Sequence, residues 1–430
     1  MSQNSDWIAS RRQVMKGLGL TGLALAVPGC VVAAEAAVAP PPAPTSGSGW
    51  TGERLFRVVQ DYSAMGNHRV GTAVDAQTNN WFANQLRAMD AEITMQPFTF
   101  DRFDGATEVT IDGETIPSMP LYYEAVGETQ SDRPHLATLK ATTGDRASQA
   151  LQDEIAKAKT AGAAIAVIAT EGAGGELSTP NCYPKLGSGM PTILVPGRYS
   201  EALAKGKVSA RYAGRIVPGE SNNVVARFGD QAATPLVVAT PLSGWFTCAA
   251  ERGTGIAVAL ALAEQFGGDY PVTVVGSPGH EILHHIGLEA YLKANRVAAS
   301  LIMHLGANVA VGQKDLETGQ VTLAHGLGNP KEIPEAGRMV FVRMDEARFN
   351  TIKSELATAQ LPAALNPPSW NGEGELWANA AGSDLMSFTG IHPLFHTSGD
   401  IPTNTTSPEA LATVYQAVAR AVATYLGSTG

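Results

Sequence analysis

Apolar residues recur at helical spacing in the first part of the mature chain. Within 52–63 and again within 75–89 they repeat every three or four residues, which predicts two amphipathic helices. The stretch 92–100 then alternates apolar and polar residues, the pattern of a strand. We therefore expect a helix, a turn at 66–72, a second helix and a strand.

A second pattern begins near residue 221, where short apolar runs alternate with helical segments. The runs that predict buried strands are 221–229, 236–240, 272–277 and 299–304. The helical segments are 255–266 and 286–295, and a further helix is expected at 408–426. Strands that alternate with helices predict an α/β fold with a mostly parallel sheet and helices on both faces.

Residues 101–220 interrupt this order. Short strand-like runs alternate with turns there, and one helix–strand unit stands out at 151–169. We interpret 101–220 as a domain inserted into a catalytic frame formed by 49–100 and 221–430.

Composition narrows the class of partner more than the class of fold. The chain has 430 residues, with 44% hydrophobic and 16% charged residues and a formal net charge of −10. A net negative charge argues against nucleic acid or an anionic membrane as the main partner. The sequence does not fix the oligomeric state.

The first 48 residues are expected to be a signal and a Pro/Ser-rich tether. Arg11 and Arg12 precede a mild apolar stretch, which resembles a twin-arginine (Tat) export signal. That stretch is too short for a transmembrane helix. Val27-Pro28-Gly29-Cys30 resembles a lipobox, which would anchor a lipid at Cys30, and the alternative is cleavage near 34–36. We expect a bacterial periplasmic protein, either soluble or a membrane-anchored lipoprotein.

The strongest chemical motif is His280-Glu281-Ile282-Leu283-His284, which directly follows the predicted strand 272–277. Its H-E-x-x-H spacing can bind a zinc ion and hold a carboxylate beside it as general base. Binding sites in α/β sheets lie beyond the carboxyl ends of the strands. The segments expected to converge on that rim are 240–252, 276–284, 304–308 and the one that contains His396.

The order of these pieces resembles the zinc exopeptidase family of bacterial leucyl aminopeptidases, aminopeptidase Y and glutamate carboxypeptidases. The matching stretches are 68–72, the re-entry strand 223–226, Gly382-Ser383-Asp384 and 395–400. Residues 162–196 resemble part of a protease-associated domain. The resemblance implies a three-layer, phosphorylase/hydrolase-like fold, a metallopeptidase activity and zinc.

The chain departs from that family at most of its metal ligands. The stretch 239–245 has no His-x-Asp, and Glu251 stands where the family has a bridging Asp. His280-Glu281 replaces a Glu-Glu pair, and His304 replaces an Asp, whereas His396 is unchanged. These departures favour one zinc ion over two.

Two interpretations of the site remain open. In the first, His280 and His284 lie one helical turn apart and ligate zinc, Glu281 is the general base, and His304, His396 or Glu251 is the third ligand. In the second, Glu281 and His396 are ligands, with Glu251 as a further one, and His280 is the base. In both, Asp384 and Asp400 are expected to orient ligands or cap loops.

The leading functional hypothesis is an exported single-zinc hydrolase of peptide or other small amide bonds, with aminopeptidase-like activity. One alternative is a catalytically degenerate homologue that serves as a periplasmic binding protein. Another is a metal hydrolase of non-peptide amides or esters. Ser243 and Cys248 lack a strand–nucleophile–helix elbow, so nucleophilic catalysis is disfavoured.

Overall fold

The computed structural model describes residues 49–140, 149–283, 285–324 and 336–428. The export signal, the lipobox at Cys30 and His284 lie outside these residues, so those predictions stay open. Among the described helices, none combines the length and the apolar character needed to cross a membrane.

Ten strands of the described chain form one mixed sheet, in the order β15-β14-β16-β11-β9-β10-β8-β1-β2, with β4 also paired to β8. The four central strands β16, β11, β9 and β10 run parallel, and antiparallel pairs flank them. These central strands are β9 (Leu236–Pro241), β10 (Val272–Ser277), β11 (Leu301–Leu305) and β16 (Asp384–Ile391). The flanking strands are β1 (Glu92–Ile111), β2 (Glu114–Ile116), β4 (Gly127–Ser131), β8 (Val208–Phe228), β14 (Gly337–Arg343) and β15 (Ala363–Leu365).

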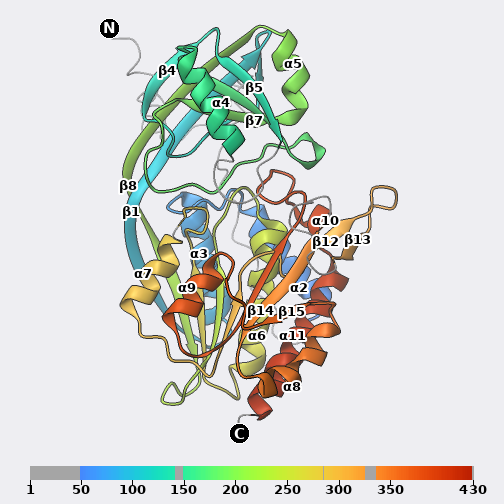
Figure 1. Cartoon of the computed structure of the whole chain (residues 1–430). Coiled ribbons are helices and arrows are strands. Elements are labelled where there is room, and N and C mark those ends of the chain that lie inside the picture. The colour runs from blue at the N-terminus through green and yellow to red at the C-terminus, as the bar shows by residue number, and fades with distance from the viewer. Residues whose placement is uncertain (1–48, 141–148, 284, 325–335, 429–430) are drawn as a thin grey trace, which may run out of the picture.

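Helices cover both faces of this sheet, which confirms the predicted α/β class (Figure 1). One face carries α2 (Gly52–Ala64), α3 (Ala73–Arg87), α6 (Thr254–Phe266), α8 (Glu346–Ala357) and α11 (Pro408–Ser428). The other carries α7 (Ile286–Ala294) and α9 (Glu373–Ala380). Thr51 and Thr72 cap α2 and α3 with their side chains, and α3 begins directly after the turn predicted at 66–72.

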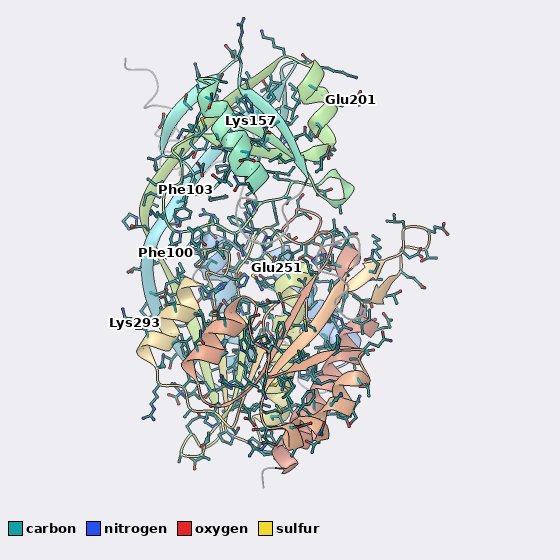
Figure 2. The ribbon with its side chains drawn as sticks, in the orientation of Figure 1. Phe100, Phe103, Lys157, Glu201, Glu251 and Lys293 are labelled. Atoms are coloured by element: carbon teal, nitrogen blue, oxygen red, sulfur yellow. The ribbon has the colours of Figure 1, made fainter. Side chains whose placement is uncertain are left out.

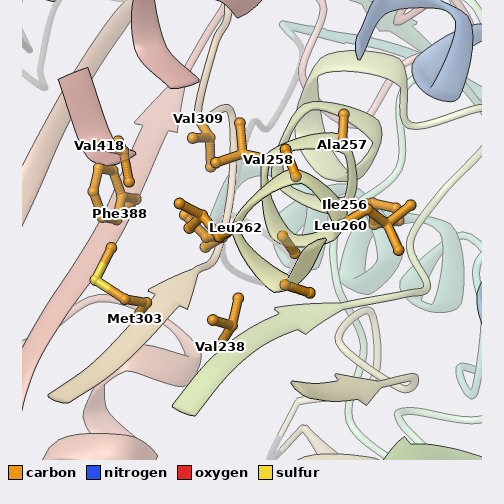
Figure 3. Packing of buried hydrophobic residues seen from close by; sticks show 14 of the residues in the cluster. Val238, Ile256, Ala257, Val258, Leu260, Leu262, Met303, Val309, Phe388 and Val418 are labelled. Carbon is orange, nitrogen blue, oxygen red and sulfur yellow. The ribbon is translucent and has the colours of Figure 1, made fainter. Parts of the chain in front are cut away.

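Helix α6 lies at the centre of the core. Its residues from Ile256 to Ala263 are fully buried on every side, because the sheet lies beneath it and α2 and α11 pack over it. Figure 3 shows Leu262 on the side of α6 that faces the strands, near Val238 of β9 and Met303 of β11. Such an all-apolar helix is stable only inside a large core, and here it holds the strand ends in place.

The part between β1 and β8 forms a second, smaller body (Figure 1). It contains a four-stranded sheet in the order β3-β7-β6-β5 and two helices. The elements are β3 (Met119–Pro120), β5 (His135–Lys140), α4 (Gln149–Thr160), β6 (Ala166–Glu171), η1 (Ala173–Gly175), β7 (Thr192–Pro196), η2 (Gly197–Tyr199) and α5 (Ser200–Lys205). Its likeness to a protease-associated domain, and the boundaries 101 and 220, stay predictions.

Strands β1 and β8 run through both bodies as one antiparallel ribbon. Glu92 pairs with Arg227 at one end and Ile111 pairs with Val208 at the other. The sequence predicted only the parts of these strands at 92–100 and 221–229. In the rest of both strands the sequence shows only short apolar runs. Gly105 and Gly214 interrupt the apolar pattern there, and these two glycines pair with each other across the ribbon.

The segment 337–391 contributes three strands and two helices that the hydrophobic pattern did not reveal. Strand β16 ends at Ile391, so it does not reach the segment that contains His396. Residues 393–396 instead form a turn. The remaining elements are the hairpin of β12 (Gly312–Lys314) and β13 (Val321–Leu323), the π-helical turn η3 (Ala249–Gly253) and α10 (Pro402–Thr405).

Candidate metal centre

The segment that carries the H-E-x-x-H motif is a turn and not a helix. Its described residues, His280–Leu283, form turns and an isolated bridge, and α7 begins only at Ile286. Pro278 and Gly279 precede the motif, and Gly279 has a positive φ of 98°, a backbone that suits glycine. Residues 280–283 therefore do not form the helical turn that the first interpretation expects, and His284 lies outside the described residues.

Three side chains from two segments of the chain converge beside this turn. His280 and His285 come from the turn after β10, and Glu373 is the first residue of α9. One ligand atom of each lies within 4.8 Å of the others. The two imidazole rings stack with their centroids 4.7 Å apart, and His280 Nδ1 lies 3.5 Å from Glu373 Oε1. We call these three residues with His304 the His280 cluster.

His304 completes the cluster from the end of β11. Its Nε2 lies 3.5 Å from Glu373 Oε2. Its Nδ1 lies 2.8 Å from the hydroxyl of Ser387, which is its direct neighbour on β16. The strand register therefore fixes the ring and directs Nε2 towards Glu373.

Five polar atoms in this cluster are buried without a hydrogen-bond partner. They are His280 Nδ1, His285 Nδ1, His304 Nε2 and both carboxylate oxygens of Glu373. A buried polar atom left without a partner costs roughly 1–3 kcal/mol, so five converging ones call for a missing group. Imidazole nitrogens and a carboxylate are the ligand set that zinc takes in catalytic sites. The residues present therefore fit one zinc ion.

The charge state of the cluster also suits a cation. Burial lowers the pKa of His280 to about 3, with Arg252 adding to the effect, so its ring is neutral at pH 7 and one ring nitrogen has a free lone pair. Burial opposes ionisation of Glu373, but the facing imidazoles of His280 and His304 outweigh burial and hold its pKa below the ordinary value. Glu373 thus carries a negative charge, and His280 carries no positive charge at pH 7.

Glu281 lies beside the cluster but faces away from it. One carboxylate oxygen accepts the N–H of Val70 at 2.6 Å, and the other accepts the hydroxyl of Ser243 at 2.6 Å. The Ser243 oxygen in turn accepts the backbone N–H groups of Gly279 and His280, at 2.5 and 3.3 Å. Burial raises the pKa of Glu281 to about 7. This bonding ties both oxygens of Glu281 to its neighbours and holds the turn, and its role as base or ligand stays a prediction.

Glu251 and His396 meet in a second group. Figure 2 shows Glu251 near the junction of the two bodies. His396 Nε2 lies 3.3 Å from Glu251 Oε1, and both side chains are 1% exposed. The same oxygen accepts a hydrogen bond of 2.6 Å from Arg252 Nη2. Burial would raise the pKa of Glu251, but Arg252 and His396 outweigh burial and lower it to about 2. We call these three residues the Glu251 group.

Asp400 supports the Glu251 group, whereas Asp384 does not. The Asp400 carboxylate accepts the N–H groups of Ala250 and Glu251, at 2.8 and 3.2 Å, at the start of η3. Asp384 stands at the amino end of β16, the wrong end of the sheet for a role at this site. There it accepts hydrogen bonds from Arg348 and Tyr425. The structure therefore does not bring Asp384 to this site.

Several residues around the two groups adopt a strained backbone. Non-glycine residues with φ between 43° and 60° gather here, namely Phe246, Cys248, His285, Asn308 and His396. Each left-handed residue costs roughly 1 kcal/mol or more, and such strain clusters at functional sites. The surrounding hydrogen bonds must hold these conformations in place.

A loop of the smaller body covers the site. Thr179 donates its N–H to the carbonyl of His396, and Cys182 donates its N–H to that of Glu281, at 3.2 and 3.0 Å. Trp245 reaches the same loop through Asn181, at 2.9 Å. Trp245 and Trp377 are each 1% exposed, so both are core residues and do not line a cleft. Cys182 and Cys248 are free, buried thiols.

The sequence predicted His280 and His304 at this rim but named neither Glu373 nor His285 among the candidate ligands. The one local signal for Glu373 is its place between Gly372 and Gly374 at a helix start. Gly374 is required there, since a Cβ atom would lie 2.4 Å from the Ser387 hydroxyl.

No protein-family model and no curated protein matches this sequence. Solved structures do match. The structure of BSAP, a zinc aminopeptidase from Bacillus subtilis, is 16% identical, with a TM-score of 0.62 over 86% of this chain and 94% of that chain.

Two further solved structures match over a similar share of the chain. A peptidase M28 precursor from Shewanella amazonensis is 14% identical, with a TM-score of 0.60 over 87% of this chain and 93% of that one. An aminopeptidase from Aneurinibacillus sp. strain AM-1 is 15% identical, with a TM-score of 0.51 over 86% and 93%. The chain therefore has the fold of these aminopeptidases over most of its length.

Proposed function

We propose that this protein is a metal-dependent hydrolase of peptide or other small amide bonds that works with one zinc ion. The observation that carries the proposal is the His280 cluster, where five buried polar atoms without partners converge. The shared fold with zinc aminopeptidases supports the class of reaction.

In this proposal His280, His285 and Glu373 hold the ion. When bound, zinc polarises the scissile carbonyl and lowers the pKa of a water molecule. His304 Nε2 accepts the proton of the attacking water, because Ser387 holds the ring with that nitrogen towards Glu373. Glu281 keeps the turn in register through Val70 and Ser243. His280 and His285 are both partly exposed, and in this proposal the substrate approaches the cluster from their side.

The test combines metal analysis with hydrolysis of aminoacyl amides. Wild-type protein should bind one zinc per chain and show hydrolysis that a chelator abolishes. His285→Ala should lose both, while His135→Ala, which alters a remote histidine paired with Glu154 in the smaller body, should lose neither. Absence of bound zinc in the wild type would refute the proposal. Zinc bound without hydrolysis of any amide or ester would favour the non-catalytic binding protein.

We also propose export by the Tat route to the periplasm, with a lipid anchor at Cys30. The paired Arg11 and Arg12 and the lipobox-like Val27–Cys30 support this. Replacement of both arginines by lysine should leave the protein in the cytoplasmic fraction. Cys30→Ala should release the exported protein from membranes, and unchanged membrane retention would refute the anchor.

A further inference from the structure

The Glu251 group has the atom types of a second metal site. Glu251 Oε2 and both ring nitrogens of His396 are buried without a hydrogen-bond partner. A carboxylate and an imidazole 3.3 Å apart are a common start for a zinc site. Residue types alone would therefore assign an ion here too.

A fixed positive charge already stands at this place. Arg252 is fully buried, and its Nη2 lies 2.6 Å from Glu251 Oε1. A guanidinium stays protonated in proteins, so the charge of Glu251 is balanced. A divalent ion bound to the same carboxylate would be repelled by this cation at close range, where little water screens it.

The guanidinium is also held from the other sides. Its Nε donates to the carbonyl of Ser243 at 3.0 Å, and its Nη1 donates to the carbonyl of Gly306 at 2.5 Å. These carbonyls follow β9 and β11, so Arg252 joins the ends of both strands. It cannot swing away to admit an ion without breaking three hydrogen bonds in the core.

We propose that Arg252 takes the place of a second metal ion and keeps Glu251 and His396 free of metal. The single ion of the proposed function is thereby confined to the His280 cluster. This inference rests on that function only for the first ion, since the claim about Arg252 concerns the second.

The test counts zinc per chain in protein stripped with a chelator and reconstituted with zinc alone. Wild type and His396→Ala should each bind one ion, and so should Arg252→Lys, which keeps the charge. Arg252→Met removes the charge and keeps a side chain of similar length, so this variant should bind two ions. The double variant Arg252→Met/His396→Ala should lose the second ion and bind one. Two ions in the wild type, falling to one in His396→Ala, would overturn the inference, as would one ion in Arg252→Met.

Thermal unfolding gives a second readout that does not depend on activity. Arg252→Met leaves Glu251 buried and unpaired, so its melting temperature should fall in chelator and rise with zinc by more than that of the wild type. Glu251→Gln/Arg252→Met removes both charges and should not show the larger rise. An equal rise in wild type and Arg252→Met would overturn the inference.

The two proposals fail separately. A count of zero in the wild type overturns the metal hydrolase. The Arg252 inference is then decided by whether Arg252→Met gains an ion that needs His396. If Arg252→Met does not fold, the wild-type and His396→Ala counts decide it.

Discussion

The turn after β10 and the start of α9 each bring a buried glutamate to the same rim, yet the two carboxylates have opposite surroundings. Protein donors, Val70 and Ser243, satisfy both oxygens of Glu281. Both oxygens of Glu373 lack a hydrogen bond and face imidazoles. Glu281 lies in a recognisable motif and Glu373 does not. The difference teaches that neighbouring donors, more than a motif, decide which carboxylate is free to bind a metal.

The largest expected effect comes from Glu373. Glu373→Gln should weaken zinc binding by at least about 100-fold, because loss of outer-sphere partners alone costs 10–100-fold. Competition with a chromogenic chelator measures this. Glu375→Gln changes an exposed glutamate on the same helix and is the matched control. If Glu373→Gln bound zinc as tightly as the wild type, the contrast between Glu373 and Glu281 would be wrong.

Glu281 should matter for stability more than for metal binding. Glu281→Ala leaves the buried N–H of Val70 and the hydroxyl of Ser243 without their acceptor, so the free energy of unfolding should fall by about 3 kcal/mol. Glu281→Gln keeps the shape and should cost about 1 kcal/mol. Urea unfolding of the metal-free protein measures both. If Glu281→Gln abolished turnover with unchanged stability, Glu281 would be a general base after all.

Asp75 is another buried carboxylate with protein donors, and the pH dependence of stability tests how such donors act. It accepts hydrogen bonds from Gly71 and Ser221, as Glu281 does from its donors, and burial raises its pKa from 3.8 to about 6. Between those values the folded state keeps a proton that the unfolded state releases, so stability falls as pH rises, by up to about 3 kcal/mol.

Asp75→Asn should remove this dependence. The difference in unfolding free energy between wild type and Asp75→Asn, measured at pH 4 and at pH 7.5, should shift in favour of the variant at the higher pH. A constant difference would show that Asp75 ionises in the folded state as easily as in the unfolded one.

The smallest expected effect concerns Ser387. Ser387→Ala removes the partner of His304 Nδ1 and should lower turnover by about 10-fold, the size typical of an outer partner, while the zinc count stays at one. Stability should change by no more than about 1 kcal/mol. A variant with wild-type turnover and an unshifted pH–rate profile would show that the β16 register alone positions His304.

The sequence predicts the frame of this molecule well, because buried strands and amphipathic helices impose periodic patterns. Its success ends where contacts depend on distant residues. The sequence could not show that the guanidinium of Arg252 pairs with the carboxylate of the neighbouring Glu251. Nor could it single out Glu373, because that residue follows a segment, 366–372, without a periodic pattern. The convergence of His280 with His304 was predictable, since both follow strands of one parallel sheet. The non-helical turn at His280 depended on Pro278, Gly279 and the bonds of Ser243.

The ribbon of β1 and β8 has a consequence for how the molecule opens. Since its paired residues run from Glu92 to Ile111 without a break, the smaller body has no flexible linker about which to swing. Amide protons along the ribbon should therefore exchange with solvent in one cooperative event that loosens both bodies together. The loop that covers the site, around Thr179 and Cys182, would then exchange as part of the same unit.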